Sequence, residues 1–196
     1  MSRKIHLDEI DRRIISILQQ NGRTALVEIG RKTGMTHVGV KRRLERLVKG
    51  GLIRISANVD ISRLKFKAAI ILVEVENYER LQQLIEMFKN CPRIICLATL
   101  SGTYNLMVLI AAEDMDTLES MILGECAIRG QRGIRKSDVQ IIESFYYPVH
   151  FPLRMISKGR SKISPCGLRC DKCGRYKLKK CLACPATIFY RGFPSD

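Results

Sequence analysis

The sequence predicts an α+β fold made of an N-terminal helix-turn-helix (winged-helix-like) domain, a ferredoxin-like βαββαβ domain and a small C-terminal cysteine-rich metal module. Three observations lead to this expectation. Apolar residues recur at helical spacing early in the chain, apolar runs alternate with helical periods between residues 66 and 147, and five cysteines lie within residues 166–184. We therefore expect domains at residues 1–55, 56–152 and 166–196, with a basic linker at residues 153–165.

Composition limits the class of protein. The chain has 196 residues, 46% of them hydrophobic, which is enough for one or two small cores. No apolar run approaches the roughly 18 to 20 residues that span a bilayer, and residues 1–7 lack the apolar stretch of a signal peptide. We expect a cytoplasmic protein with no membrane partner. In that reducing compartment, clustered cysteines serve more often as metal ligands or redox switches than as disulfides.

Charge is divided unevenly along the chain, whose formal net charge is +15. Residues 1–55 carry 13 Lys or Arg against 5 Asp or Glu, residues 56–152 carry 10 against 12, and residues 153–196 carry 11 against 2. Both ends are basic and the middle is not. Neutralising phosphates releases condensed counterions, so this division favours a nucleic-acid partner at the ends.

Capping signals predict the first two helices. The apolar spacing indicates a helix that begins near Asp8 and ends at Asn21. Thr24 is expected to cap a second helix. That helix ends at Gly34, because glycine readily takes the left-handed conformation of a C-cap and a sharp turn.

A third predicted helix, capped by Thr36, has one apolar and one basic face. The apolar face carries Val40, Leu44 and Leu47. In a helix-turn-helix protein the N-terminal half of the second motif helix enters the major groove of double-stranded DNA. The candidates for contacts with base edges are His37, Val38, Lys41 and Arg42. The candidates for contacts with phosphates are Arg43, Arg46 and Lys49.

The same segment resembles the DNA-binding domain of the Lrp/AsnC (leucine-responsive, feast/famine) transcription regulators. The shared residues are the opening Leu7-Asp8-x-x-Asp11, the turn Asn21-Gly22-Arg23, and the string Val40-x-x-Arg43-Leu44-x-x-Leu47-x-x-x-Gly51-x-Ile53. The resemblance runs from residue 7 to residue 54 without a gap. It implies a DNA-binding regulator.

The middle of the chain predicts the order strand, helix, strand, strand, helix, strand. The expected elements are Phe66–Val75, Leu81–Phe88, Ile94–Leu100, Leu106–Ala111, Met115–Leu123 and Val139–Tyr147. A glycine-containing hairpin at residues 101–105 joins the second and third strands. This order is the ferredoxin-like arrangement, with two helices on one face of an antiparallel sheet.

The uncovered sheet face favours a homodimer, which the family resemblance also implies, together with higher rings of dimers. In relatives the hairpin after the second strand carries a Gly-x-Tyr-Asp-like motif beside an effector pocket, often for an amino acid. The corresponding residues here are Gly102, Tyr104 and Asn105, with a neutral amide in place of the aspartate. They are candidate contacts for an amino-acid-like effector. The alternative is a tight turn with a packed tyrosine and no ligand.

The family resemblance ends near Pro152, and the cysteines beyond it have the order Cys166-x3-Cys170-x2-Cys173-x7-Cys181-x2-Cys184. Two Cys-x2-Cys pairs favour a tetrathiolate zinc knuckle with Cys166 left over. Cys166, Cys170 and Cys173 with one of the later pair would instead suit a [4Fe-4S] cluster. We expect zinc first, with the cluster as the alternative and a thiol switch without metal as the third possibility. The other cysteines, Cys91, Cys96 and Cys126, are predicted to be small core residues.

These features predict a sequence-specific transcriptional regulator tuned by a metal or redox site, and not an enzyme. The sequence shows no nucleophile with a neighbouring base, no phosphate loop and only three scattered histidines. Two other functions stay open at this point. One is an iron-sulfur redox or electron-transfer protein, and the other is a weakly specific architectural DNA-binding protein.

Overall fold

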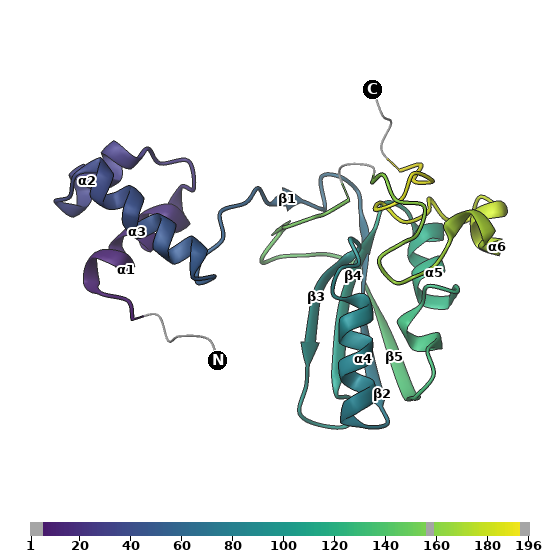
Figure 1. The fold of residues 1–196 in the computed structure, drawn as a ribbon. Helices are drawn as coiled ribbons and strands as arrows, with labels where there is room; N and C mark the ends of the chain where they lie inside the picture. The colour runs from purple at the N-terminus through teal and green to yellow at the C-terminus, as the bar shows by residue number, and fades with distance from the viewer. Residues whose placement is uncertain (1–5, 156–158, 193–196) are drawn as a thin grey trace. The chain divides into compact units, whose positions relative to one another are not determined.

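The computed structural model describes residues 6–155 and 159–192 and divides into two compact units (Figure 1). The first ends at Ala57 and the second begins at Asn58. The second unit contains the cysteine-rich segment as well as the sheet domain. The expected linker at residues 153–165 and the expected cysteine module at residues 166–196 both extend in part outside the described residues.

The N-terminal unit is a three-helix helix-turn-helix domain. It consists of α1 (Glu9–Gln20), α2 (Leu26–Thr33) and α3 (His37–Lys49). Ile14, Ile29 and Val40, one from each helix, are fully buried and form its core. The helical spacing of apolar residues therefore gave the correct packing faces. Residues 6–57 contain no strand, so in this range the domain is the plain form and not the winged one.

The helix ends follow the predicted capping with one exception. The Thr36 hydroxyl accepts from the Gly39 N–H at 3.2 Å, and Gly34 has the left-handed φ of 71°. Thr24 does not cap α2, which begins after Ala25 without a side-chain cap. The Thr24 hydroxyl donates instead to the carbonyl of Asn21 at 2.7 Å. It closes the preceding turn, so it is not available to the helix.

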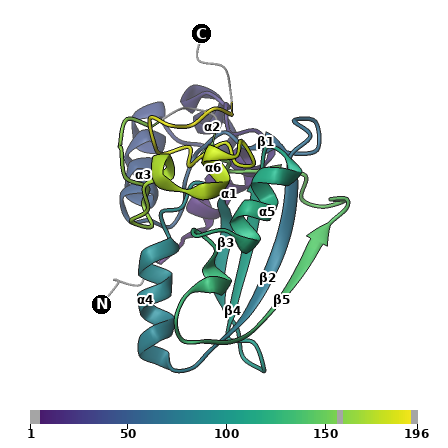
Figure 2. The ribbon, with the colours of Figure 1, turned by 90° about the vertical axis from the view of Figure 1, so that its right-hand side faces the viewer.

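The second unit contains the predicted ferredoxin-like βαββαβ domain. Its elements are β2 (Lys67–Val75), α4 (Tyr78–Phe88), β3 (Ile94–Thr99), β4 (Leu106–Ala112), α5 (Met115–Leu123) and β5 (Ile134–Ile142). The sheet has the order β3-β4-β2-β5, and every neighbouring pair is antiparallel. Figure 2 shows both helices on one face of it.

The sheet has a different apolar cluster on each face. Under the helices, Leu84 and Leu118 pack with Val73 and Val108 in the main core, and all four are fully buried. On the other face a smaller cluster forms around Phe66, Phe151 and Met155. A two-stranded pairing of β1 (Val59–Asp60) with β6 (His150–Phe151) adds to that face. The small cluster and this pairing hold together the segments that precede and follow the ferredoxin-like domain.

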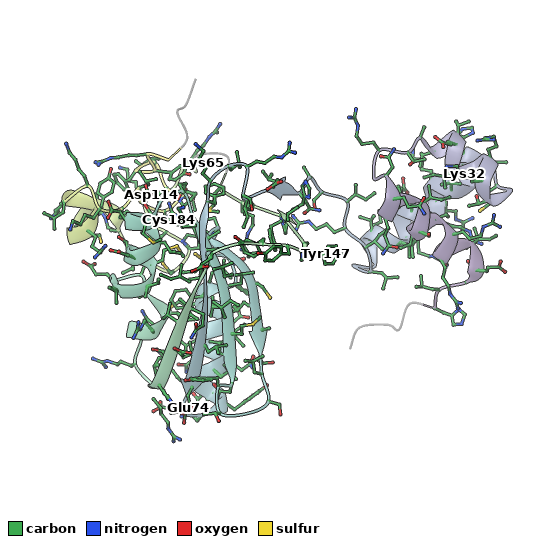
Figure 3. All side chains as sticks on the ribbon, turned by 180° about the vertical axis from the view of Figure 1, so that it is seen from behind. Lys32, Lys65, Glu74, Asp114, Tyr147 and Cys184 are labelled. Carbon is green, nitrogen blue, oxygen red and sulfur yellow. The ribbon has the colours of Figure 1, made fainter. Side chains whose placement is uncertain are left out.

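The last strand of the sheet lies earlier than the sequence predicted. Residues 139–147 form the most apolar run in this region, but β5 is Ile134–Ile142. Polar residues such as Lys136, Asp138 and Gln140 belong to the strand because β5 is an edge strand with only β2 beside it. Tyr146 and Tyr147, predicted to end the strand, are more than 90% exposed. Figure 3 labels Tyr147. Apolar content alone does not predict where an edge strand lies, because one side of such a strand is exposed to solvent and carries polar residues.

The C-terminal segment packs on the sheet domain with short elements. These are the 3-10 helix η2 (Cys170–Lys172) and α6 (Gly174–Lys177), after an earlier 3-10 turn η1 (Ile128–Gly130). The segment expected as a linker is packed at both ends, because Met155 and Ser164 are buried. The N–H of Gly159 donates to the carbonyl of Pro185 at 2.7 Å. None of the helices that the structure describes is long and apolar enough to cross a membrane.

Candidate DNA interface and cysteine-lined cavity

The N-terminal half of α3 presents an exposed, basic surface. All five residues expected at base edges or at the cap are exposed, namely Thr36, His37, Val38, Lys41 and Arg42. Val38 is 62% exposed and so lies on this solvent-facing side of the helix. Val40 and Leu47 face the opposite way into the core. The helix therefore has one exposed basic face and one buried apolar face, as a helix that binds in a DNA groove requires.

Two arginines expected at phosphates are paired with carboxylates of α1. Asp11 is fully buried and forms ion pairs with both Arg43, at 2.9 Å, and Arg46. Arg43 also contacts Asp8 at 2.5 Å, and this hydrogen bond lowers the pKa of the Asp8 carboxyl. These pairs fasten α3 to α1. Arg46 keeps 52% of its side chain exposed and so can still face a phosphate, whereas Arg43 is only 25% exposed.

The hairpin residues proposed for an effector have clear structural roles. Gly102 has a φ of 142°, which favours glycine. The Asn105 side chain accepts from the N–H of Val75 and donates to the carbonyl of Val75, each at 2.8 Å. The ammonium of Lys136 lies over the ring of Tyr104 at 5.6 Å. Asparagine suits this position because one side chain must both donate and accept.

Replacing Asn105 by aspartate is expected to destabilise the sheet domain by about 1–3 kcal/mol. The carboxylate cannot donate, so the carbonyl of Val75 loses its hydrogen bond and faces a negative oxygen. Urea unfolding followed by circular dichroism measures the loss. Asn58→Asp is the control, because it adds the same charge at an exposed position. Equal midpoints for the two variants would contradict the role given to Asn105.

The cysteine-rich segment docks on α5 through polar contacts. The Ser120 hydroxyl lies 2.6 Å from the carbonyl of Lys180 and accepts from Arg175 Nε at 2.5 Å. The N–H of Leu182 donates to the Thr117 hydroxyl at 3.2 Å. Figures 1 and 2 both show α6 beside α5. The segment is thus part of the domain surface and not a free appendix.

Arg93 joins the sheet to the segment at its centre. Its guanidinium pairs with Glu113 at 2.8 Å and donates to the carbonyl of Ala183 at 2.5 Å. Only 5% of the Arg93 side chain is exposed. Tyr190 completes the group, because its hydroxyl bonds to Glu113 and its ring lies under Arg93 at 5.7 Å. Burial opposes the charge, but Glu113 raises the pKa of Arg93, which therefore stays protonated.

Beneath this segment lies a cavity of about 70 Å³ lined by seven of the eight cysteines, all but Cys96. The five predicted cysteines of the segment are brought together there. Cys91, from the turn before β3, and Cys126, which follows α5, join them. Figure 3 labels Cys184 of this segment and Asp114, whose side chain caps α5. The sequence had predicted Cys91 and Cys126 as core residues, because their apolar surroundings give no sign of this neighbourhood.

The chemistry of the cavity is that of buried thiols. Burial raises the pKa of Cys91, of Cys170 and, to about 12, of Cys184. An occupant that binds thiolates must therefore displace protons. Among the described residues, no three His, Cys, Asp or Glu side chains are grouped closely enough to hold one metal ion.

Two family sequence profiles match the chain. The AsnC-type helix-turn-helix domain matches residues 7–48, and the Lrp/AsnC ligand binding domain matches residues 68–145. Neither matched range includes residues 146–196. The cysteine segment is therefore outside what the family profiles describe.

Individual relatives agree with the profiles. An HTH-type transcriptional regulator from Pyrococcus horikoshii is 32% identical over 145 residues, which cover 73% of this chain and 90% of the relative. A second, from Mycobacterium tuberculosis, is 28% identical over 141 residues and covers 70% of this chain and 93% of the relative. Both are aligned over most of their own length.

Solved structures show the same fold. The AsnC protein of Escherichia coli has a TM-score of 0.60 at 17% identity, with 72% of this chain and 95% of that chain covered. A transcriptional regulator from Neisseria meningitidis, solved as a complex with L-Met, has a TM-score of 0.60 at 20% identity. The alignment covers 76% of this chain and 96% of the Neisseria meningitidis chain.

Proposed function

The chain belongs to the Lrp/AsnC family of DNA-binding transcriptional regulators, and on that premise we propose that it is a sequence-specific regulator whose α3 enters the major groove. The family consists of transcription regulators and not of enzymes. The observation that carries the proposal is the exposed face of α3, where His37, Val38, Lys41 and Arg42 extend to solvent over a packed core.

Each side chain on this face has a defined task in the proposal. Lys41 and Arg42 donate to base edges or phosphates, and His37 contacts the first bases at the helix N-terminus. Val38 contacts a thymine methyl group, which explains an exposed apolar side chain in this place. Thr36 caps the helix and so aligns it. Arg46 contacts a phosphate while Asp11 fixes its direction.

We also propose that the protein works as a homodimer, or a ring of dimers, through the sheet domain. Ile141 is 53% exposed at the edge strand β5, and Leu100 is 38% exposed after β3. β3 and β5 are the two edge strands of the sheet, and an open strand edge can pair with a second copy of the chain. Two copies of α3 related by a twofold axis would contact two half-sites about one helical turn of DNA apart.

An amino-acid-like effector is the third part of the proposal. The support is the Neisseria meningitidis relative, whose structure is an L-Met complex. In this proposal Gly102 and Tyr104 are the hairpin residues that contact the effector. Asn105 shapes the hairpin from behind, since both ends of its amide are already bonded to Val75.

The last part concerns a metal site in the cysteine segment. Cys166, Cys170, Cys173, Cys181 and Cys184 all line one cavity, which supports a thiolate site for zinc or for a [4Fe-4S] cluster. A segment with short helices and few buried apolar residues gains its stability from ligation. Arg93 and Ser120 connect such a site to the sheet and to α5.

DNA binding through the basic segments of the chain predicts that the affinity for DNA falls steeply as the salt concentration rises. Each phosphate neutralised contributes about −0.9 to the slope of log affinity against log salt, so a dimer with about six contacts gives a slope near −5. Fluorescence anisotropy with a mixed-sequence duplex at several salt concentrations measures it. A slope near zero would contradict the proposed interface. The measurement needs no knowledge of the operator, because phosphate contacts do not depend on sequence.

A further inference from the structure

Cys91 and Cys184 occupy matching turns although they are far apart in the sequence. Each cysteine is followed by a proline. In the first turn the N–H of Ile94 donates to the carbonyl of Cys91 at 3.2 Å, and in the second the N–H of Thr187 donates to the carbonyl of Cys184 at 2.9 Å. Proline suits the second position of such a turn because its φ is fixed there. The two cysteines thus have the same local backbone.

Both cysteines also line the cavity beneath the cysteine-rich segment. The Cys170 sulfur accepts from the N–H of Cys184 at 3.3 Å. Backbone N–H groups directed at sulfur stabilise thiolates and tune metal-bound thiolates in particular. Cys91 therefore shares both its turn and its cavity with Cys184, a candidate ligand of the segment.

Cys126 lines the same cavity but is not followed by a proline. Its thiol donates to the carbonyl of Ser120 across 3.7 Å, which is a role for a protonated sulfur. Burial raises the pKa of Cys126 as well. We assign Cys126 to the wall of the cavity. The contrast separates two cysteines that the sequence had placed in one class.

The grouping of the cysteines indicates the class of occupant. In a tetrahedral zinc site each Zn–S bond is about 2.3 Å, so the sulfurs approach to about 3.8 Å of one another. Among the described residues, no three His, Cys, Asp or Glu side chains form a group that could hold a single metal ion. Thiolates of an iron-sulfur cluster bind separate irons around a buried core. Cys91 and the five cysteines of the segment line one cavity of about 70 Å³, which suits an occupant that takes its thiolates at separate irons.

We propose that Cys91 of the sheet domain is a ligand, together with cysteines of the C-terminal segment, to an iron-sulfur cluster in this cavity. The inference rests on the proposed thiolate site of the segment and adds a ligand and an occupant to it. A cluster bound in this way joins the segment to the turn between α4 and β3. Arg93 follows Cys91 by two residues and bonds to Ala183, so the same two segments are also joined by protein contacts.

The test is metal and sulfide analysis of full-length protein purified without oxygen. The parent chain is compared with Cys91→Ser, with Cys170→Ser and with Cys96→Ser as the matched control, because Cys96 lies outside the cavity. We expect equal iron and sulfide in the parent and in Cys96→Ser. Iron and sulfide in Cys91→Ser should be about tenfold lower, the scale of loss when a metal site is damaged. Cys126→Ser should retain the cluster.

Alkylation of the unsubstituted protein covers the case in which Cys91→Ser does not fold. Peptide mapping after iodoacetamide treatment should show Cys91 protected until a chelator removes the iron, while labelling of Cys96 does not change. Full iron and sulfide in a folded Cys91→Ser, with loss in Cys170→Ser, would overturn the role of Cys91 and leave the proposed site of the segment intact. Stoichiometric zinc without sulfide would overturn the cluster. Protein with neither metal would overturn both the inference and the proposed site.

Discussion

Replacing Lys41 and Arg42 together by alanine is expected to weaken operator binding by about 100-fold or more. Each contact from a recognition helix contributes about 1–3 kcal/mol, and both side chains are exposed on the half of α3 that enters the groove. Neither side chain forms an ion pair among the described residues, so the fold should not change. Fluorescence anisotropy at one salt concentration gives the change in affinity, and circular dichroism verifies the helices.

The matched control is Arg63→Ala with Lys67→Ala, which removes the same charge from exposed positions in the second unit. That variant should bind within a fewfold of the parent, since long-range charge is screened at physiological salt. Equal loss in the two variants would mean that net charge alone determines affinity. Unchanged affinity in the α3 variant would remove α3 from the interface.

Replacing Arg93 by alanine is expected to lower the free energy of unfolding of the second unit by about 3–5 kcal/mol. Removing one partner of a buried ion pair leaves the other charge buried without compensation. Here Glu113 is only 9% exposed in its side chain, and the carbonyl of Ala183 would lose its donor as well. The midpoint of urea unfolding, followed by circular dichroism, measures the effect.

An exposed arginine on the same sheet provides the comparison. Arg135 pairs with Glu74 at 3.7 Å but is 64% exposed, so Arg135→Ala should cost less than about 1 kcal/mol. The two substitutions remove the same charge from one domain. A similar small cost for both would show that Arg93 does not fasten the cysteine segment to the sheet.

Local signals explain why the helices were predicted well. Thr36 and Gly34 act through bonds to residues within three or four positions, so the sequence contains both partners. The order βαββαβ followed in the same way from hairpin and helix signals. The end strand β5 was misplaced because its position depends on pairing with β2 and not on its own apolar content.

The parts that sequence reasoning missed are contacts between distant residues. Asp11 and Arg46 are 35 positions apart, and Arg93 reaches Ala183 across 90. Charge alone could not show that these groups are paired and buried. The neighbourhood of Cys91 is the clearest case, since it forms only when the C-terminal segment folds back. The repeated Cys-Pro dipeptide at Cys91 and Cys184 was the one available signal.

The most direct test of the central claim is selection of binding sites from a random-sequence DNA pool by the full-length protein. A sequence-specific regulator should enrich one motif, with two half-sites in inverted orientation about one helical turn apart, since a twofold dimer presents two copies of α3. The enriched duplex should bind about 1,000-fold or more tightly than unselected DNA at the same salt. A pool that binds but yields no motif would contradict specific recognition and assign the protein an architectural role.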